Sequence, residues 1–389
     1  WQVQISEMGK LFDHESLVDY PFLVPPDEKI WGQVNLGFCE TTGAPVGIYP
    51  HEVHTLIAGG TNSGKTTLLT HIIRQHIDAG IPVLIFDYEN DFPERLDDVN
   101  VNKLDLDDLR WNPLEVPPGV NPVLYLQQFC ATFSDNQGLL TGSKGYLLSQ
   151  IHHLFELYGV FEGSNSFPSM FDLSDFLAAK MRRTKSNTRE YTYLEVSHNR
   201  IDNLVKALPN VLDCSIGMPL HILTRSNLVL LLSGLDFELQ TLLVTLMLTW
   251  LCRYFIANGM RNNPDYRIAV FLDEAQRLYD RQQEHRVYQG IPVISHLTAT
   301  VRKYNLSLFV AVQQPSMLAS SMTANAHTKI QLRLGDGKDI MDLGTSMFLT
   351  PEQVYYSRLI ETGQAIVKFP GGRWPEPFII RIPYEEQEQ

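Results

Sequence analysis

The chain has few cysteines, no net positive charge and few long hydrophobic runs. Its four cysteines lie far apart among 389 residues and form no C-x-x-C pair. This spacing argues against a zinc site or a disulfide framework and favours reduced thiols. The formal net charge of −13 means that the surface as a whole does not attract nucleic acid, so any contact with DNA has to be local. The most apolar stretch, Leu239 to Cys252, is shorter than the roughly 18 residues that a membrane span needs and predicts a core helix.

A signal peptide and internal repeats are also not apparent, and the only biased segment is the short acidic tail, residues 385–389. Together with the reduced thiols, these features lead us to expect a cytoplasmic protein without a membrane span. A length of 389 residues allows a large core and two or three domains.

The most informative segment that is present is glycine-rich. Residues 59–67, GGTNSGKTT, fit the pattern G-x-x-x-x-G-K-[ST], with a strand-like run before them and helical spacing after them. In this context glycines let backbone N–H groups turn toward phosphate oxygens, and the helix N-terminus favours negative charge. Lys65 is predicted to reach the β- and γ-phosphates of ATP, and the Thr66 hydroxyl to hold Mg²⁺. The predicted nucleotide contacts are Gly60, Thr61, Asn62, Ser63, Gly64, Lys65, Thr66 and Thr67.

A second part of the same site is predicted far downstream. Residues 266–275, YRIAVFLDEA, form a near-continuous apolar run that ends in two carboxylates, as is typical of a central parallel strand. Ligands of such sheets lie at the carboxyl ends of the strands. Asp273 is therefore expected to hold Mg²⁺, and Glu274 to polarise the water that attacks the γ-phosphate. The alternative is a nucleotide-binding switch or an inactive relic. The intact Lys65, Thr66, Asp273 and Glu274 argue against a relic.

Another apolar run, Val83 to Asp87, follows the first helix. Strand, helix and strand at this spacing predict a βαβ unit with a right-handed crossover. Asp87 either helps to arrange the water of the metal ion or is a structural carboxylate at the strand end, and the sequence leaves both readings open.

The rest of the chain divides by its pattern. We expect an N-terminal β extension (1–50), a first part of the ATPase core (51–104), a helical insertion (105–219) and a second core part with the C-terminal tail (220–389). Within the insertion, helices are predicted over 122–133, 144–158, 173–181 and 198–208, the third capped by Asp172 or Ser174. The last strands are expected at 306–312, 330–334 and 363–368.

Seven segments occur in a characteristic order: His54 to Gly59, Ile85 to Asp91, Trp111 to Leu114, Leu272 to Ala275, Arg302 to Leu306, Val312 to Ser316 and Gly363 to Ala365. In this order they resemble the HerA–FtsK superfamily of ring-shaped DNA-pumping ATPases, nearest to the HerA branch and its conjugation-ATPase relatives. The predicted fold class is α/β: a RecA-like P-loop NTPase core with a mainly parallel central sheet, a helical insertion and a small N-terminal β extension.

The resemblance implies further roles. Gln313 would sense the γ-phosphate, and Arg302 matches an arginine that such a ring offers to the γ-phosphate of the neighbouring subunit, an effect worth roughly 10³-fold or more in rate. A helix-end cation on the surface is the alternative for Arg302, and Arg333 and Arg358 are weaker candidates for the same role. The chain departs from the family in having Gln314 where an arginine is common, and in having little that corresponds to the preceding β-barrel of archaeal HerA.

Two basic stretches are candidates for DNA contact. Residues 180–189 hold five cations and no acid, and they either track phosphates or form a solvated linker. Residues 277–286 follow the acidic strand, but Asp280 and Glu284 offset their charge, so a surface helix fits equally well. Without a basic patch studded with aromatic residues, we expect backbone tracking rather than sequence-specific readout.

The sequence therefore predicts a Mg²⁺-dependent ATPase that translocates DNA through a homo-oligomeric ring, expected to be a hexamer with nucleotide between subunits. The resemblance implies a nuclease or other effector as partner, in DNA end processing, plasmid transfer or anti-phage defence. Two alternatives share the same core: a conjugation or secretion-system ATPase, and a nucleotide-gated scaffold for a partner effector.

Overall fold

The computed structural model describes residues 20–50, 54–258, 267–284, 293–301 and 303–383. Through these residues runs a single sheet of eleven strands in the order β2-β1-β11-β10-β9-β3-β8-β7-β4-β6-β5. In the part of the sheet from β9 to β5, each strand is parallel to the next one. The remaining pairs, β2–β1, β1–β11, β11–β10 and β10–β9, are antiparallel. The mainly parallel sheet that the sequence predicts is therefore confirmed, with an antiparallel edge added to it.

The strands of this sheet are β1 (Val34–Cys39), β2 (Pro45–Ile48), β3 (Thr55–Ala58), β4 (Val83–Asp87), β5 (Asn102–Leu104), β6 (Leu228–Leu231), β7 (Ile268–Leu272), β8 (Leu306–Val312), β9 (Thr328–Gln331), β10 (Gln364–Lys368) and β11 (Phe378–Arg381). The larger helices are α3 (Lys65–Asp78), α4 (Pro122–Gln137), α5 (Thr141–Leu157), α6 (Met170–Met181), α7 (Arg189–Ala207), α10 (Phe237–Ala257), α12 (Val293–Val301) and α14 (Gly337–Ser346). Short helical segments are α2 (Asp27–Ile30), α8 (Pro209–Leu212), α9 (Leu220–Arg225), η2 (Ala275–Arg277), α11 (Arg281–Glu284), η3 (Pro315–Met317), α13 (Ser320–Asn325) and α15 (Pro351–Tyr356).

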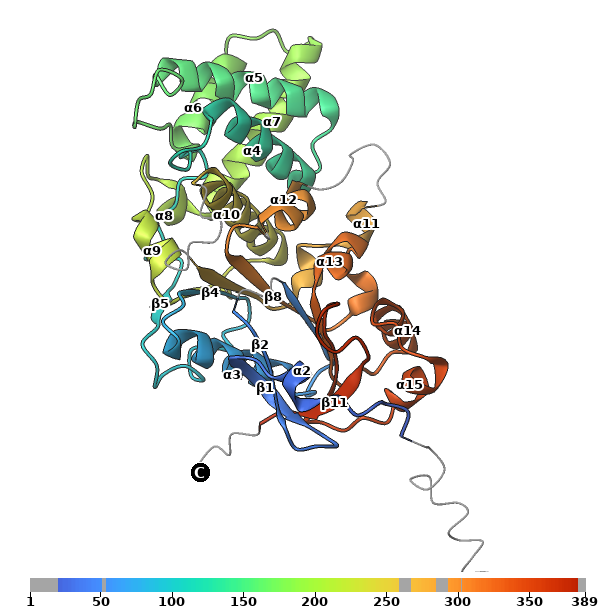
Figure 1. Cartoon of the computed structure of the whole chain (residues 1–389). Coiled ribbons are helices and arrows are strands. Elements are labelled where there is room, and N and C mark those ends of the chain that lie inside the picture. The colour runs from blue at the N-terminus through green and yellow to red at the C-terminus, as the bar shows by residue number, and fades with distance from the viewer. Residues whose placement is uncertain (1–19, 51–53, 259–266, 285–292, 302, 384–389) are drawn as a thin grey trace, which may run out of the picture.

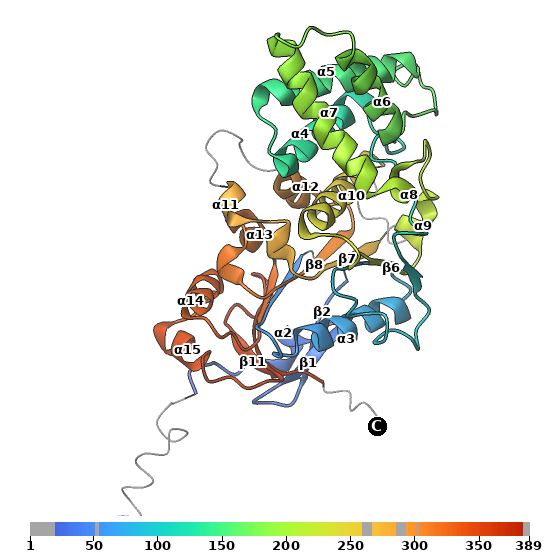
Figure 2. The same ribbon diagram turned by 180° about the vertical axis from the view of Figure 1, so that it is seen from behind.

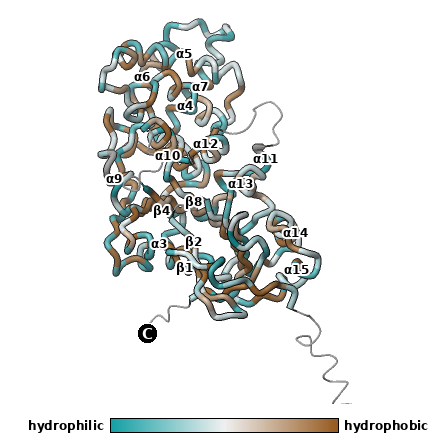
Figure 3. The backbone as a smooth tube through the Cα atoms, viewed as in Figure 1, coloured by the Kyte–Doolittle hydropathy of each residue, from teal (hydrophilic) through white to brown (hydrophobic). Residues whose placement is uncertain are grey.

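The central strands are buried on both faces. In β3, Leu56 and Ala58 belong to one core cluster and Ile57 to the other, because side chains alternate along a strand. The Ile57 face packs against α3, and the other face is covered by α10 and α12. Strand β4 is a hydrophobic segment, brown in Figure 3, and all five of its residues are buried. Continuous apolar strands are what parallel sheets with two covered faces require.

Helices α4 to α7 form a group at one end of the molecule, and α10 lies between this group and the sheet (Figures 1 and 2). The indole N–H of Trp250 on α10 donates to the carbonyl of Glu115 over 2.9 Å, and the hydroxyls of Thr132 and Thr249 lie 3.3 Å apart. The helical group is thus joined to the sheet through the core of α10. The domain boundaries expected at residues 50, 104 and 219 stay a prediction.

All four helices expected in this group are present, but the cap predicted for the third one was wrong. Helix α6 begins at Met170, and Ser169 is its N-cap. The Ser169 hydroxyl accepts from the backbone N–H of Asp172 over 3.0 Å, while the Asp172 carboxylate accepts from the backbone N–H of Ser169 over 2.8 Å. This reciprocal capping box satisfies two amides at once, which explains why the helix starts earlier than its apolar pattern alone suggested.

Helix α10 is the only one among the described residues with the length and apolar composition of a membrane span. In its most apolar window, 83% of the residues are buried inside the protein. The expectation of a core helix fits this burial.

The last strand, β11, was missed from sequence, and it connects the N-terminal segment to the sheet. It pairs antiparallel with both β10 and β1. The side chain of Gln75 on α3 also donates to the carbonyl of Asn35 on β1 over 2.8 Å and accepts from its N–H over 2.6 Å. The N-terminal β segment is consequently part of the central sheet and contacts the helix that follows the phosphate loop.

We predict that Gly37→Ala disrupts the junction between β1 and β11. Gly37 has φ +147°, and a Cβ at this position would overlap the carbonyl oxygen of Arg381. The expected loss is about 3 kcal/mol of unfolding free energy, because a steric overlap adds to the backbone strain. Gly43→Ala is the control, since Gly43 has φ +71° with open space around it, and we expect about 1 kcal/mol. Urea denaturation measures both, and equal losses would contradict the pairing.

Candidate nucleotide-binding site

The glycine-rich loop lies between β3 and α3. Helix α3 begins at Lys65, and its N-cap, Gly64, has φ +92°. The backbone N–H of Gly59 donates to the carbonyl of Val312 over 3.0 Å, and that of Gly60 to the carbonyl of Arg333 over 2.9 Å. The loop is therefore anchored to the ends of β8 and β9. Its remaining amides and the start of α3 form the kind of concave surface that binds phosphate.

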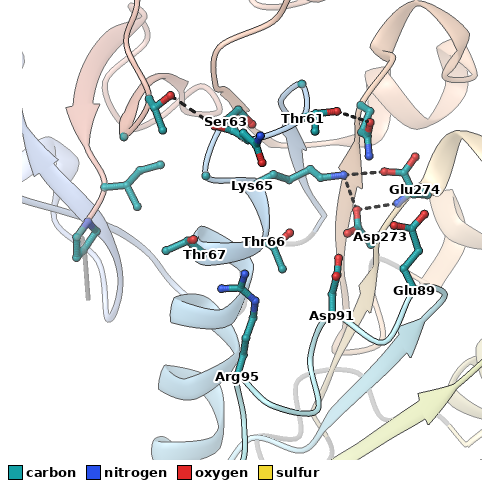
Figure 4. Close-up of a pocket in the computed structure, with 18 residues that line it drawn as sticks. Thr61, Ser63, Lys65, Thr66, Thr67, Glu89, Asp91, Arg95, Asp273 and Glu274 are labelled. Atoms are coloured by element: carbon teal, nitrogen blue, oxygen red, sulfur yellow. Dashed lines mark hydrogen bonds and ion pairs between the residues drawn. The ribbon is translucent and has the colours of Figure 1, made fainter. Parts of the chain in front are cut away.

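Lys65 joins the two parts of the site that the sequence predicts separately (Figure 4). Its Nζ lies 2.7 Å from Oδ1 of Asp273 and 2.8 Å from Oε1 of Glu274. All three side chains are close to buried, with exposed fractions of 7%, 11% and 10%. The two acids follow β7, and β3 and β7 are separated in the sheet by β8 alone. The sheet order thus brings together residues that lie 208 positions apart.

Lys65 and Glu274 hold each other in their ionised forms. Burial lowers the pKa of Lys65, but the two carboxylates outweigh this effect and raise the pKa above its ordinary value. Burial likewise raises the pKa of Glu274, but the charge of Lys65 and hydrogen bonds from Lys65, Gln276 and Gln313 outweigh it and lower the pKa. Glu274 is consequently a buried carboxylate that remains ionised at neutral pH and can accept a proton.

The backbone at Glu274 is unusual. Its φ of +47° and ψ of +38° place a non-glycine residue in the left-handed region, at a cost of roughly 1–2 kcal/mol. The Asp273 carboxylate accepts from the backbone N–H of Glu274 over 2.8 Å, which helps to hold this turn. Strain of this kind gathers at functional sites because it directs a side chain that a relaxed strand end would aim elsewhere.

A cavity of about 510 Å³ lies over this cluster. It is lined by the whole predicted phosphate loop, Gly60 to Thr67, and by Asp273, Glu274 and Gln313. Gln313 follows β8, and its Oε1 lies 3.5 Å from the Thr61 hydroxyl. The structure therefore gathers these predicted site residues around one space. The Thr66 hydroxyl and the Asp273 carboxylate are oxygen donors of the type that Mg²⁺ prefers, and their role as metal ligands stays a prediction.

Arg333, Arg358 and Asp87 are not among the residues that line this cavity. Arg302 lies outside the described residues, so its role stays a prediction. Arg333 and Arg358 are exposed, and neither lines the cavity. Asp87 is buried, and its carboxylate accepts from the backbone N–H groups of three residues of the following turn, Glu89, Asp91 and Phe92. The structural reading of Asp87 is thus the one that its contacts support.

Sequence reasoning missed a second group of lining residues: Glu89, Asp91, Arg95, Thr362, Gly363, Ile382 and Pro383. Glu89 and Asp91 follow β4, and the Arg95 side chain points toward the start of α3 (Figure 4). A signal existed for Glu89, Asp91 and Gly363, because all three lie in segments that carry the family resemblance. No pattern marks Ile382 and Pro383, which reach the cavity only because β11 pairs with β10.

Comparison with known proteins decides the family. A family model described as the central domain of the helicase HerA matches residues 34–245, more than half of the chain. The chain belongs to the HerA central-domain family. The resemblance to the HerA–FtsK superfamily is thereby confirmed. No curated protein matches the sequence of this HerA-family chain.

Solved structures similar to this HerA-family chain include those of VirB4 and of the plasmid coupling protein TrwB. VirB4 of Thermoanaerobacter pseudethanolicus matches with a TM-score of 0.73 and 18% identity over 92% of this chain and 98% of that one. The plasmid coupling protein TrwB in complex with a non-hydrolysable ATP analogue matches with a TM-score of 0.67 and 13% identity over 95% and 96%. TrwB in complex with ADP and Mg²⁺ matches with a TM-score of 0.64 and 15% identity over 91% of each chain. At these identities the likeness shows the fold, which is that of a RecA-like P-loop ATPase.

We predict that Lys65→Met destabilises the nucleotide-free protein most at neutral pH. Removing the cation leaves two buried carboxylates without a counter-charge, a loss of about 3–5 kcal/mol of unfolding free energy. In the wild type the pKa of Glu274 lies below its ordinary value of 4.5. The ion pair with Lys65 therefore stabilises the folded wild-type protein above pH 4.5, and this stabilisation is lost as the pH falls through the lowered pKa. In the variant, acid instead neutralises the unpaired carboxylates. The difference in unfolding free energy between the wild type and Lys65→Met should therefore become smaller from pH 7 to pH 4.

Urea unfolding at several pH values measures this gap. Lys103→Met is the matched control, because Lys103 forms an exposed pair with Asp97 that is worth less than about 1 kcal/mol. A gap that does not change with pH, or a Lys65→Met protein as stable as the wild type, would refute the buried three-charge cluster.

Proposed function

We propose that this chain is a Mg²⁺-dependent ATPase. The observation that carries the proposal is the contact of Lys65 with both Asp273 and Glu274 on the floor of a cavity that the phosphate loop lines. A phosphate-binding loop, a lysine and two carboxylates at the carboxyl edge of neighbouring parallel strands form the set that nucleotide hydrolysis uses. The HerA family assignment and the fold shared with TrwB, which has been crystallised with an ATP analogue, support it.

In the proposed reaction, Lys65 leaves the carboxylates and pairs with the β- and γ-phosphates of ATP. Glu274 then accepts a proton from a water molecule whose oxygen attacks the γ-phosphorus. The bond between this phosphorus and the oxygen that bridges it to the β-phosphate breaks, giving ADP and phosphate. Gln313 borders the same space and is positioned to contact the γ-phosphate. Thr66 and Asp273 would hold Mg²⁺, which neutralises charge on the phosphates.

We predict that Lys65→Ala and Glu274→Gln both abolish ATP turnover, for different reasons. The first variant loses the cation that binds the phosphates, so its ATP affinity should fall. The second loses the proton acceptor but keeps the shape and the phosphate loop, so it should still bind ATP with Mg²⁺. Phosphate release and binding of a fluorescent ATP analogue measure the two effects. Robust turnover by Glu274→Gln would remove this residue from the catalytic role.

We further propose that the ATPase works as a homo-oligomeric ring, a hexamer, that moves along DNA in the cytoplasm. The supports are its membership of the HerA family and the overall fit to conjugation ATPases. Arg302 is the proposed source of an arginine offered to the neighbouring subunit, with Arg333 and Arg358 as further candidates. A nuclease or other effector in DNA end processing or anti-phage defence is the proposed partner.

The proposed DNA contact is the loop between α6 and α7. Arg182, Arg183, Lys185 and Arg189 are exposed there. Lys180 is engaged instead, since its Nζ donates to Gln150 over 2.7 Å. The second basic stretch is less suited to DNA, because its described arginines already have acidic partners: Arg277 pairs with Glu89 and Arg281 with Asp342.

We predict that alanine at Arg182, Arg183 and Lys185 together weakens DNA binding for every sequence alike. Each lost phosphate contact should reduce the slope of log affinity against log salt concentration by about 1. Lys206→Ala is the control, because Lys206 lies on α7 in the same helical group and pairs with Asp202 within the helix. Fluorescence anisotropy with labelled duplexes measures the slopes. An unchanged slope would place the DNA contact elsewhere.

A second candidate function is that of a conjugation or secretion-system ATPase. The match to VirB4 over 92% of this chain favours it. The two functions share the catalytic core and differ in what stimulates turnover. Stimulation by DNA alone supports the translocase, whereas stimulation only by a partner protein supports a secretion ATPase or a scaffold for an effector.

A further inference from the structure

We infer that Gln276 is a positioning residue that fixes the orientation of Glu274 for proton transfer. Its Nε2 donates to Oε2 of Glu274 over 2.6 Å, whereas Lys65 donates to Oε1 over 2.8 Å. These two donors thus bind different oxygens of the carboxylate, to which Gln313 also donates. This inference rests on the proposed role of Glu274 as the proton acceptor.

The orientation of the Gln276 amide follows from chemistry. An ionised carboxylate only accepts hydrogen bonds, so the nitrogen and not the oxygen of the amide has to face Glu274. The other atom, Oε1 of Gln276, is buried and has no hydrogen-bond partner among the described residues. A buried acceptor without a partner costs about 1–3 kcal/mol. The fold tolerates this cost while it holds the amide nitrogen against Glu274.

The two contacts differ in what becomes of them when ATP binds. In the proposed reaction Lys65 turns to the phosphates, so Oε1 of Glu274 loses its partner and becomes available to a water molecule. Gln276 lies on η2, outside the phosphate loop, and the proposed reaction requires no movement of it. It would therefore keep Oε2 occupied and leave Oε1 as the proton acceptor. Without Gln276 the carboxylate would lose the donor that holds Oε2.

Gln276 does not belong to the hydrophobic core, so its replacement need not unfold the protein. It lines a second cavity, of about 620 Å³, on the side of Glu274 that faces the helical group. Asn136 and Gln137 at the end of α4 and Arg200 on α7 line the same cavity. Glu274 borders both cavities, and the side chain that holds it is reachable from the helical side.

The test compares Gln276→Leu, which removes the donor at similar size, with Gln276→Glu, which puts a second carboxylate beside Glu274. We expect kcat to fall about 10- to 100-fold, as is usual when a residue that orients a catalytic group is lost, with the KM for ATP changed by less than about threefold. A lost donor also raises the pKa of Glu274, so the acid limb of the kcat–pH profile should move to higher pH. The movement should be larger in Gln276→Glu.

Gln137→Leu is the matched control, because it changes the same cavity without touching Glu274, and its acid limb should stay in place. ATP binding and the melting temperature of each variant show whether it has folded. If Glu274→Gln is inactive but Gln276→Leu keeps the wild-type kcat and acid limb, the inference fails and the proposed function stands. If kcat falls but the acid limb of the kcat–pH profile does not move, Gln276 has only a structural role and the inference fails as well. Turnover by Glu274→Gln would instead overturn the proposed function itself.

Discussion

The contact of the Lys65 cation with the adjacent carboxylates of Asp273 and Glu274 depends on the order of the strands in the sheet. Three neighbouring strands supply the parts at their carboxyl ends: β3 leads into the loop that carries Lys65, β8 into Gln313, and β7 into Asp273 and Glu274. Since all three strands are parallel, their ends meet at one edge of the sheet. Exchanging any one of them for an antiparallel strand would move its residues to the opposite edge.

The three charged groups of this cluster contact one another in the nucleotide-free protein. Buried charges are costly unless they are paired, and here Lys65 and Glu274 stabilise each other's charge, as the raised pKa of Lys65 and the lowered pKa of Glu274 indicate. In the proposed reaction, phosphate oxygens would replace the carboxylates as partners of Lys65 and Mg²⁺ would replace Lys65 as the partner of Asp273, so that nucleotide binding exchanges one set of ion pairs for another. Gln276 would keep its contact with Glu274 through that exchange, as the positioning role inferred for it requires.

The elements that were predictable from sequence are those with a local cause. The apolar runs of β4 and β8 and the glycine-rich loop before Lys65 needed no knowledge of the tertiary structure. The residues that were missed depend on long-range pairing: Ile382 and Pro383 reach the cavity through the antiparallel edge of the sheet. Gln276 is an ordinary glutamine in the sequence, and its contact with Glu274 arises from the left-handed turn after β7. The cap of α6 was missed for a different reason, because the serine that forms it precedes the apolar pattern.

The most direct test of the account is a structure of the protein bound to Mg²⁺ and a non-hydrolysable ATP analogue. The account predicts that Lys65 has left both carboxylates and lies within hydrogen-bond distance of the β- and γ-phosphates, with Glu274 facing the γ-phosphate and still bonded to Gln276. A nucleotide bound away from the phosphate loop, or a Lys65 that still bridges Asp273 and Glu274 with nucleotide present, would contradict it.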